Sequence, residues 1–166
     1  MTRGARTAIT LSVLGLVLAV AAAWGWTAAT KPLPAKVDTP ICVSTDVAEG
    51  ERVFPQDVTV SVYNASDRDG LAGRTMQLLT DEGFAEGSSG NVSGQVDVVQ
   101  IWTLDPESPA VALVASRLGD DVEIQRRQPP GVGVAVVVGD DFDTLVKGRK
   151  AVVAESDTEI CSPPIG

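Results

Sequence analysis

The sequence contains no histidine and only two cysteines, and aromatic residues make up 4% of its 166 residues. Without histidine the chain lacks the commonest general base and the commonest protein ligand of transition metals. Two cysteines cannot supply a four-cysteine zinc site. We therefore predict a protein that is not an enzyme and that has no cofactor, no metal site and no catalytic residues.

Basic residues are also scarce, and the formal net charge is -9. Arg3 and Arg6 precede the first acidic residue, so the chain from Lys31 onward holds 11 basic and 22 acidic residues. A surface with this excess of negative charge repels phosphate backbones, so nucleic acid is not expected as a partner.

A long uncharged segment lies near the N-terminus, from Ala8 to Ala29. Leu, Val and Ala dominate it, and as a helix it is long enough to cross a hydrocarbon layer about 30 Å thick. Arg3 and Arg6 predict that residues 1–7 stay in the cytoplasm and that everything after Thr30 is extracytoplasmic. We expect a single-pass anchor in the cell membrane over residues 8–29; a cleaved signal peptide is the alternative.

Residues 30–57 are predicted to form a proline-rich stalk and lead-in, with Thr45–Glu51 as an acidic loop. A folded domain is expected over residues 58–146. Residues 147–166 are expected to form a C-terminal tail with little regular structure after Glu159.

The most informative stretch predicts a strand, a loop and a helix in succession. Val58–Tyr63 alternates valine with hydroxyl residues, as in a half-buried strand. Apolar residues recur at helical spacing over Leu71–Glu82, and Asp67 or Asp69 is expected to cap that helix. Gly83 is expected to end it in the left-handed conformation.

The rest of the domain repeats this alternation of strands and helices. A short strand is expected at Phe84, followed by a flexible polar connection over Gly87–Gly94. The later elements are a strand over Val96–Leu104, a helix from Pro109 to Gly119 with Ser108 as its cap, an edge strand over Asp121–Arg127, and a central strand over Val132–Val138. We predict a small α/β (α+β) two-layer sandwich of four to five strands, with both helices on one face.

Three segments of the chain resemble the LytR C-terminal domain family. They are Val-Tyr-Asn-Ala-Ser followed by Gly70-Leu71-Ala72-Gly73-Arg74, the strand end Ile101-Trp102 before a Pro-Glu helix start, and Val-Val-Val-Gly-Asp-Asp-Phe. The resemblance implies a cell-envelope domain that stands alone behind one membrane helix. It implies no transferase activity, because the catalytic domain of larger family members has no counterpart here.

The loop from Asn64 to Gly70 and the helix start after it hold the candidate ligand-binding residues, which are Asn64, Ser66, Arg68 and Arg74. A helix N-terminus carries partial positive charge and could present its amides to a sugar or peptide. The alternative is a structural turn. Asp140, Asp141 and Asp143 are expected to form a solvated turn, since the spacing of a calcium loop is missing. Trp102 is expected in the core, with a sugar-stacking platform as the alternative.

Cys42 and Cys161 bracket the domain, and in an oxidising compartment we expect them to form one disulfide. Taken together, these features predict a non-catalytic, membrane-anchored envelope domain. Its expected partner is a wall glycan, either peptidoglycan or a glycopolymer, or a protein of wall assembly. The alternative is an interaction or scaffold module that touches no glycan.

Overall fold

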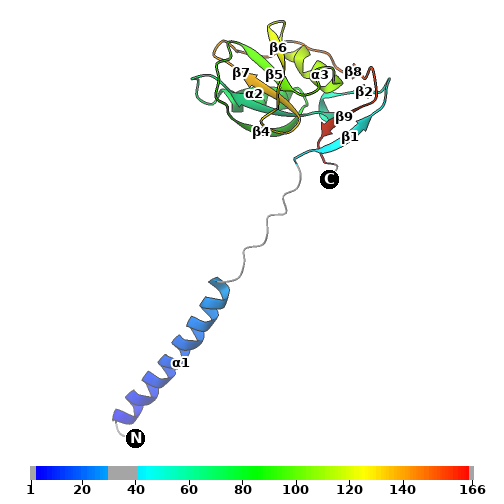
Figure 1. The fold of residues 1–166 in the computed structure, drawn as a ribbon. Coiled ribbons are helices and arrows are strands. Elements are labelled where there is room, and N and C mark those ends of the chain that lie inside the picture. Colours follow the sequence, from blue (N-terminus) through cyan, green and yellow to red (C-terminus); the bar gives the residue numbers. More distant parts are fainter. Residues whose placement is uncertain (1–2, 30–40, 165–166) are drawn as a thin grey trace. The chain divides into compact units, whose positions relative to one another are not determined.

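The computed structural model describes residues 3–29 and 41–164 of the chain (Figure 1). The chain divides into two units, Met1–Thr39 and Pro40–Gly166. Each unit is described by itself.

The first unit contains one helix, α1, over Arg3–Ala29. It covers the segment for which a helix was predicted. Within residues 3–29 and 41–164, no helix combines the length and the apolar character needed to cross a membrane. Membrane crossing by residues 8–29 therefore stays a prediction. The proline-rich part of the predicted stalk, residues 30–40, lies outside the described residues.

The second unit is built on a five-stranded sheet in the order β4-β3-β7-β5-β6. Strand β3 runs parallel to β4 and β7, whereas β5 is antiparallel to β7 and parallel to β6. One helix connects β3 to β4 and another connects β5 to β6. The central strand and the edge strand at the end of the sheet were both predicted correctly. The bounds are β3 Thr59–Asn64, α2 Leu71–Asp81, β4 Ala85–Asn91, β5 Val99–Thr103, α3 Pro109–Leu118, β6 Val122–Arg126 and β7 Val134–Val138.

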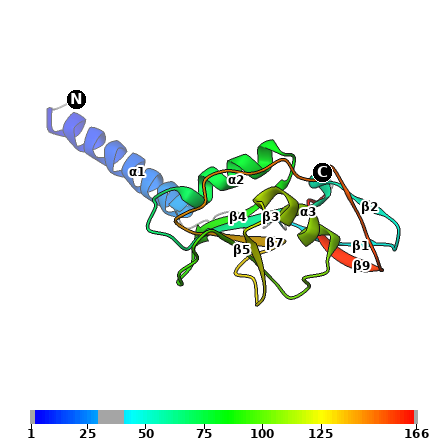
Figure 2. The same ribbon diagram turned by 90° about the horizontal axis from the view of Figure 1, so that it is seen from above.

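Both helices pack on the same face of this sheet, which confirms the predicted sandwich (Figure 2). Leu79 of α2 and Leu113 of α3 belong to one buried cluster together with Val60, Ile101 and Val136 of three neighbouring strands. All five side chains are inaccessible to solvent. Burial of aliphatic side chains contributes about 1.5–3 kcal/mol each, so this layer supplies most of the driving force for folding.

The opposite face of the sheet is also covered, and this corrects the prediction that the first strand is half-buried. All six residues of β3 are buried. Tyr63, Trp102 and Val137 belong to a second buried cluster on this face. The Arg127 guanidinium lies 3.9 Å from the centroid of the Trp102 ring. Trp102 therefore packs in the core, as predicted, and does not present an open platform.

The predicted flexible connection over Gly87–Gly94 is wrong in its first half, because residues up to Asn91 belong to β4. The small residues allow β4 to approach β3 closely. A Cβ atom at Gly87 would lie 2.6 Å from Ser61 Oγ and 2.7 Å from the carbonyl oxygen of Val60. The polar sequence of this segment suggested a loop. An edge strand, however, needs main-chain pairing on one side only and few apolar side chains.

The segments before and after the sheet are ordered, contrary to the predicted loop and tail. Strand β1 (Val43–Val47) pairs antiparallel with β9 (Thr158–Ser162), and β2 (Arg52–Val53) pairs with β8 (Val152–Val153). A short 3-10 helix, η1 (Pro55–Asp57), follows β2. The Cys42–Cys161 disulfide closes the β1-β9 ribbon. The pairing went unpredicted because each strand is short and its partner lies about 100 residues or more away in the sequence.

Candidate functional site

The end of β3 and the loop after it contain three of the four predicted ligand-binding residues, and they bond to one another. The side-chain amide of Asn64 donates to the carbonyl oxygen of Arg68 at 2.8 Å. The Asn64 Oδ1 atom accepts from the backbone N–H and the hydroxyl of Ser66, at 2.9 and 2.6 Å. The Ser66 hydroxyl in turn accepts from the backbone N–H of Arg68 at 3.1 Å. The polar groups of Asn64 and Ser66 therefore hold the shape of the loop itself.

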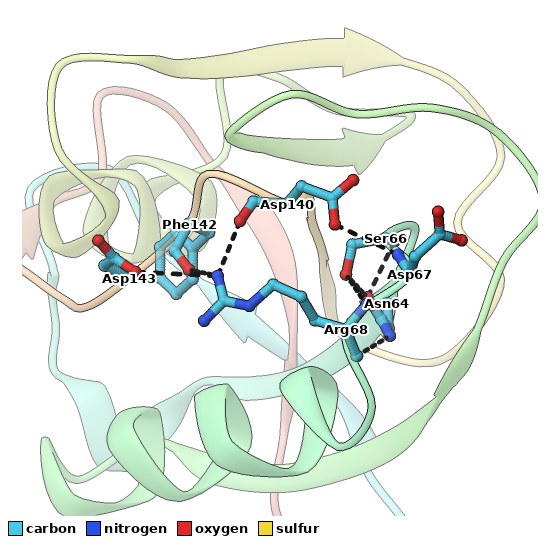
Figure 3. A network of polar contacts seen from close by, with 7 residues as sticks. All are labelled: Asn64, Ser66, Asp67, Arg68, Asp140, Phe142 and Asp143. Atoms are coloured by element: carbon cyan, nitrogen blue, oxygen red, sulfur yellow. Dashed lines mark hydrogen bonds and ion pairs between the residues drawn. The ribbon is translucent and has the colours of Figure 1, made fainter.

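The Arg68 side chain bridges this loop to the one after β7 (Figure 3). Its Nη1 atom donates to the carbonyl oxygens of Asp140 and Phe142, each at 2.8 Å. The Asp143 carboxylate lies 3.8 Å from the same Nη1 atom and is exposed, so this ion pair contributes little to stability. The backbone N–H of Asp67 donates to Asp140 Oδ1 at 3.3 Å. These bonds join two loops more than 70 residues apart and favour the structural-turn alternative; ligand binding by this loop stays a prediction.

Neither Asp67 nor Asp69 caps α2, which corrects the prediction. The N-cap residue is Gly70, in the left-handed conformation, and no side chain bonds to the first turn. The network from Asn64 to Arg68 positions the loop so that the helix starts after Gly70, beyond both aspartates. Arg74 is exposed on α2 and lies outside the network drawn in Figure 3.

Replacing Arg68 by alanine is expected to lower the free energy of unfolding by about 1.5–3 kcal/mol, because two hydrogen bonds from a charged donor are lost. Urea denaturation followed by circular dichroism measures the change. Arg74→Ala is the matched control and should stay within about 0.5 kcal/mol of the parent, since its side chain is exposed. Equal effects of the two substitutions would contradict a bridging role for Arg68.

A cavity of about 200 Å³ lies where the N-terminus of α3 meets one end of the sheet and strand β9. The starts of β3 and β7 contribute Thr59 and Val134, the first turn of α3 contributes Ser108 and Val111, and β9 contributes Ile160. None of these residues was predicted as a binding residue. The sequence predicted a helix start at Ser108-Pro109, but nothing in the pattern indicated that β9 would lie beside it.

Several polar groups at this cavity have no protein partner among the described residues. Thr59 is fully buried, and its Oγ1 atom makes no hydrogen bond. Ser108 is the N-cap of α3, but its side chain does not bond to the first turn. The first N–H groups of any helix lack acceptors within that helix. The cavity therefore lies beside a helix N-terminus without a side-chain cap, whereas the Thr59 Oγ1 atom is buried away from it.

A second cavity, of about 330 Å³, lies between the β1-β9 ribbon and β2. Its walls include Val43, Val47, Val53 and Ile160. None of the buried polar atoms that lack a partner in the described residues belongs to its lining. The smaller cavity beside α3 is the better candidate for specific recognition, because Ser108 and the N-terminus of α3 lie at it. No group of three acidic, cysteine or histidine side chains in the described part of the chain could hold a metal ion.

A family model relates this chain to the cell envelope. The soluble domain of a conserved hypothetical secreted protein from Mycobacterium marinum is similar, with 26% sequence identity and a TM-score of 0.42. That alignment covers 60% of this chain and 77% of the other. The comparison with curated proteins finds no match. A sequence model described as LytR cell envelope-related transcriptional attenuator matches residues 57–142, from the end of η1 to the loop after β7. Since this match spans more than half of the chain, the protein belongs to the LytR cell envelope-related transcriptional attenuator family, as its sequence motifs predicted.

Proposed function

We propose that this protein is a non-catalytic domain of the cell envelope that binds a wall component, either peptidoglycan or another wall glycopolymer. Membership in a cell-envelope-related family is the observation that carries the proposal. The cavity beside α3 supports a binding role, because it is a concave site lined by both apolar and polar residues. The acidic surface makes a neutral ligand more suitable than an anionic one.

We further propose that the domain lies outside the cytoplasm and that residues 8–29 anchor it to the membrane. The Cys42–Cys161 disulfide supports this location, since such bonds persist in oxidising compartments. Arg3 and Arg6 favour a cytoplasmic N-terminus. Thiol alkylation of intact cells tests the compartment. Two cysteines that alkylate without prior reduction would contradict it.

Binding to the wall is tested with the full-length protein in a mild detergent and purified peptidoglycan. We expect the protein to sediment with the peptidoglycan at about 0.15 M salt. Retention should change little as the salt is raised, because an acidic protein does not depend on attraction to anionic polymers. Protein unfolded by reduction and urea is the control. Absence of retention at this ionic strength would contradict glycan binding.

The open edges of the sheet favour a second candidate function, which is protein–protein interaction without glycan binding. Strands β4 and β6 each pair on one side only within the described residues. An unpaired edge can receive a strand from another protein. Crosslinking in intact cells tests this alternative. A single stoichiometric protein partner, found together with no retention on peptidoglycan, would favour it.

A further inference from the structure

Strand β6 is the last strand of the five-stranded sheet, and its outer edge is regular and open. Every residue of Val122–Arg126 has a register partner in β5 without interruption. Strand β4, at the other end of the sheet, has a register shift opposite Val60–Val62, and such an irregularity disfavours further pairing. Strand β6 contains no proline and no lysine, and all its residues after Val122 are exposed. Of the two ends of this sheet, β6 is therefore better able to accept another strand.

The hydrogen bonds to β5 determine which main-chain groups of β6 point outward. The backbone N–H of Arg127 donates to the carbonyl oxygen of Thr103 at 2.9 Å, so the main-chain groups of Arg127 point toward β5. Because this direction alternates from residue to residue, Val122, Ile124 and Arg126 direct theirs to the free edge. These three residues have the spacing at which a second strand forms hydrogen-bonded pairs.

The charges along this edge are complementary to a second copy that runs in the opposite direction. Asp121 and Glu123 lie at its start, and Arg127 lies at its end. In an antiparallel pair centred on Ile124, Asp121 of each copy lies opposite Arg127 of the other. A parallel pair would bring like charges together, which is destabilising. The formal net charge of -9 opposes association in general, so an interface between two copies needs local complementarity of this kind.

The apolar side chains of β6 lie on the face of the sheet that carries the helices. Val122 and Ile124 are in register with Val99 and Ile101, which belong to the main core. Ile124 is nevertheless 41% exposed, because no strand lies beyond it in the described residues. In the antiparallel pair it lies directly opposite Ile124 of the second copy. Association therefore covers an apolar side chain that the single copy leaves open.

The charged side chains that would pair lie on the opposite face. Asp121 and Glu123 line one cavity, and the Arg127 guanidinium stacks on Trp102 of the second buried cluster. Glu123 Oε2 accepts from the side-chain amide of Gln100 at 3.0 Å. Its other oxygen can accept from the glutamine that lies opposite it in a second copy. Both faces of β6 are therefore compatible with the same antiparallel register.

We propose that two copies of this protein associate through β6, in antiparallel register about Ile124, to form one continuous sheet. Each outward residue then exchanges main-chain hydrogen bonds with the residue opposite it. The sequence of the edge specifies a second copy of this chain as the occupant, because its acidic start and basic end match only when the strand is reversed. This self-association goes beyond the proposed wall binding and does not depend on it.

Sedimentation equilibrium of the full-length protein in a density-matched detergent measures the association. We expect dimers that dissociate on dilution. Ile124→Lys should weaken the dimer about tenfold or more, because it places two ammonium groups opposite each other at the two-fold axis. Val153→Lys is the matched control, since Val153 is 50% exposed on β8, and it should leave the dimer unchanged. Circular dichroism checks that both variants fold.

A charge exchange tests the register. Asp121→Lys and Arg127→Glu should each weaken the dimer about 5- to 30-fold, because each variant brings like charges together twice in one dimer. An equal mixture of the two variants should associate about as well as the parent. In the mixed dimer each cation lies opposite an anion of the other copy. A merely structural role of either residue would not be restored by mixing.

Two outcomes would overturn the proposal. Monomers at every concentration would exclude self-association and leave this edge to a strand of a different protein. A dimer that Ile124→Lys and both charge variants leave unchanged would show that the copies meet elsewhere. Weakening by Ile124→Lys, without restoration in the mixture, would overturn the antiparallel register about Ile124.

Discussion

Replacing Cys42 and Cys161 together by serine is expected to lower the free energy of unfolding by about 4–5 kcal/mol. The disulfide joins residues 119 positions apart, so it removes much of the freedom of the unfolded chain. Because small domains are stable by only about 5–15 kcal/mol, this loss would leave the protein marginally stable. Urea denaturation followed by circular dichroism, with and without reductant, measures it.

Ser44→Ala is the control for this substitution. Ser44 lies on β1 opposite Cys161, and its hydroxyl bonds to an exposed carboxylate. It should change stability by less than about 0.5 kcal/mol. A double cysteine variant with the stability of the parent would show that the β1-β9 ribbon does not depend on the covalent link. Strand β9 also forms one wall of the cavity beside α3, so loss of the disulfide should lower the affinity for any ligand that binds there.

The elements with a regular hydrophobic pattern were predictable from the sequence. Helix α2 and strand β7 have apolar residues at the spacing that their packing requires, and both were placed within two residues of their observed bounds. Strand β4 has no such pattern, because its residues are small and it pairs along one edge. The β1-β9 and β2-β8 pairs depend on contacts between the two ends of the domain, which local propensity does not reveal.

The candidate site was predictable only in part. The sequence placed Asn64, Ser66 and Arg68 in one loop, and the structure shows them bonded together. It could not reveal that Arg68 donates to carbonyl oxygens in the loop after β7, because main-chain acceptors carry no residue signature. The cavity beside α3 could not be predicted from the sequence for a similar reason. It exists because four segments that are distant in the sequence meet there.

Replacing Gly133 by alanine is expected to lower the free energy of unfolding by about 4 kcal/mol or more, at the level of severe single substitutions. Gly133 precedes β7 and has a φ angle of +70°, in the left-handed region. That conformation alone costs an alanine about 1–2 kcal/mol. A Cβ atom there would also overlap the carbonyl oxygen of Thr59 in the neighbouring strand. The two central strands would have to separate to admit it.

The Gly50→Ala variant separates the cost of the left-handed conformation from the cost of the overlap. Gly50 has a φ angle of +85°, but no atom lies within 4 Å of the position that a Cβ would take. It should therefore lose only about 1–2 kcal/mol, the cost of the conformation. The difference between the two variants, measured by urea denaturation, is the cost of separating β3 from β7. A similar loss in both variants would contradict the close approach of these strands at Thr59, and with it the position of Thr59 in the wall of the cavity.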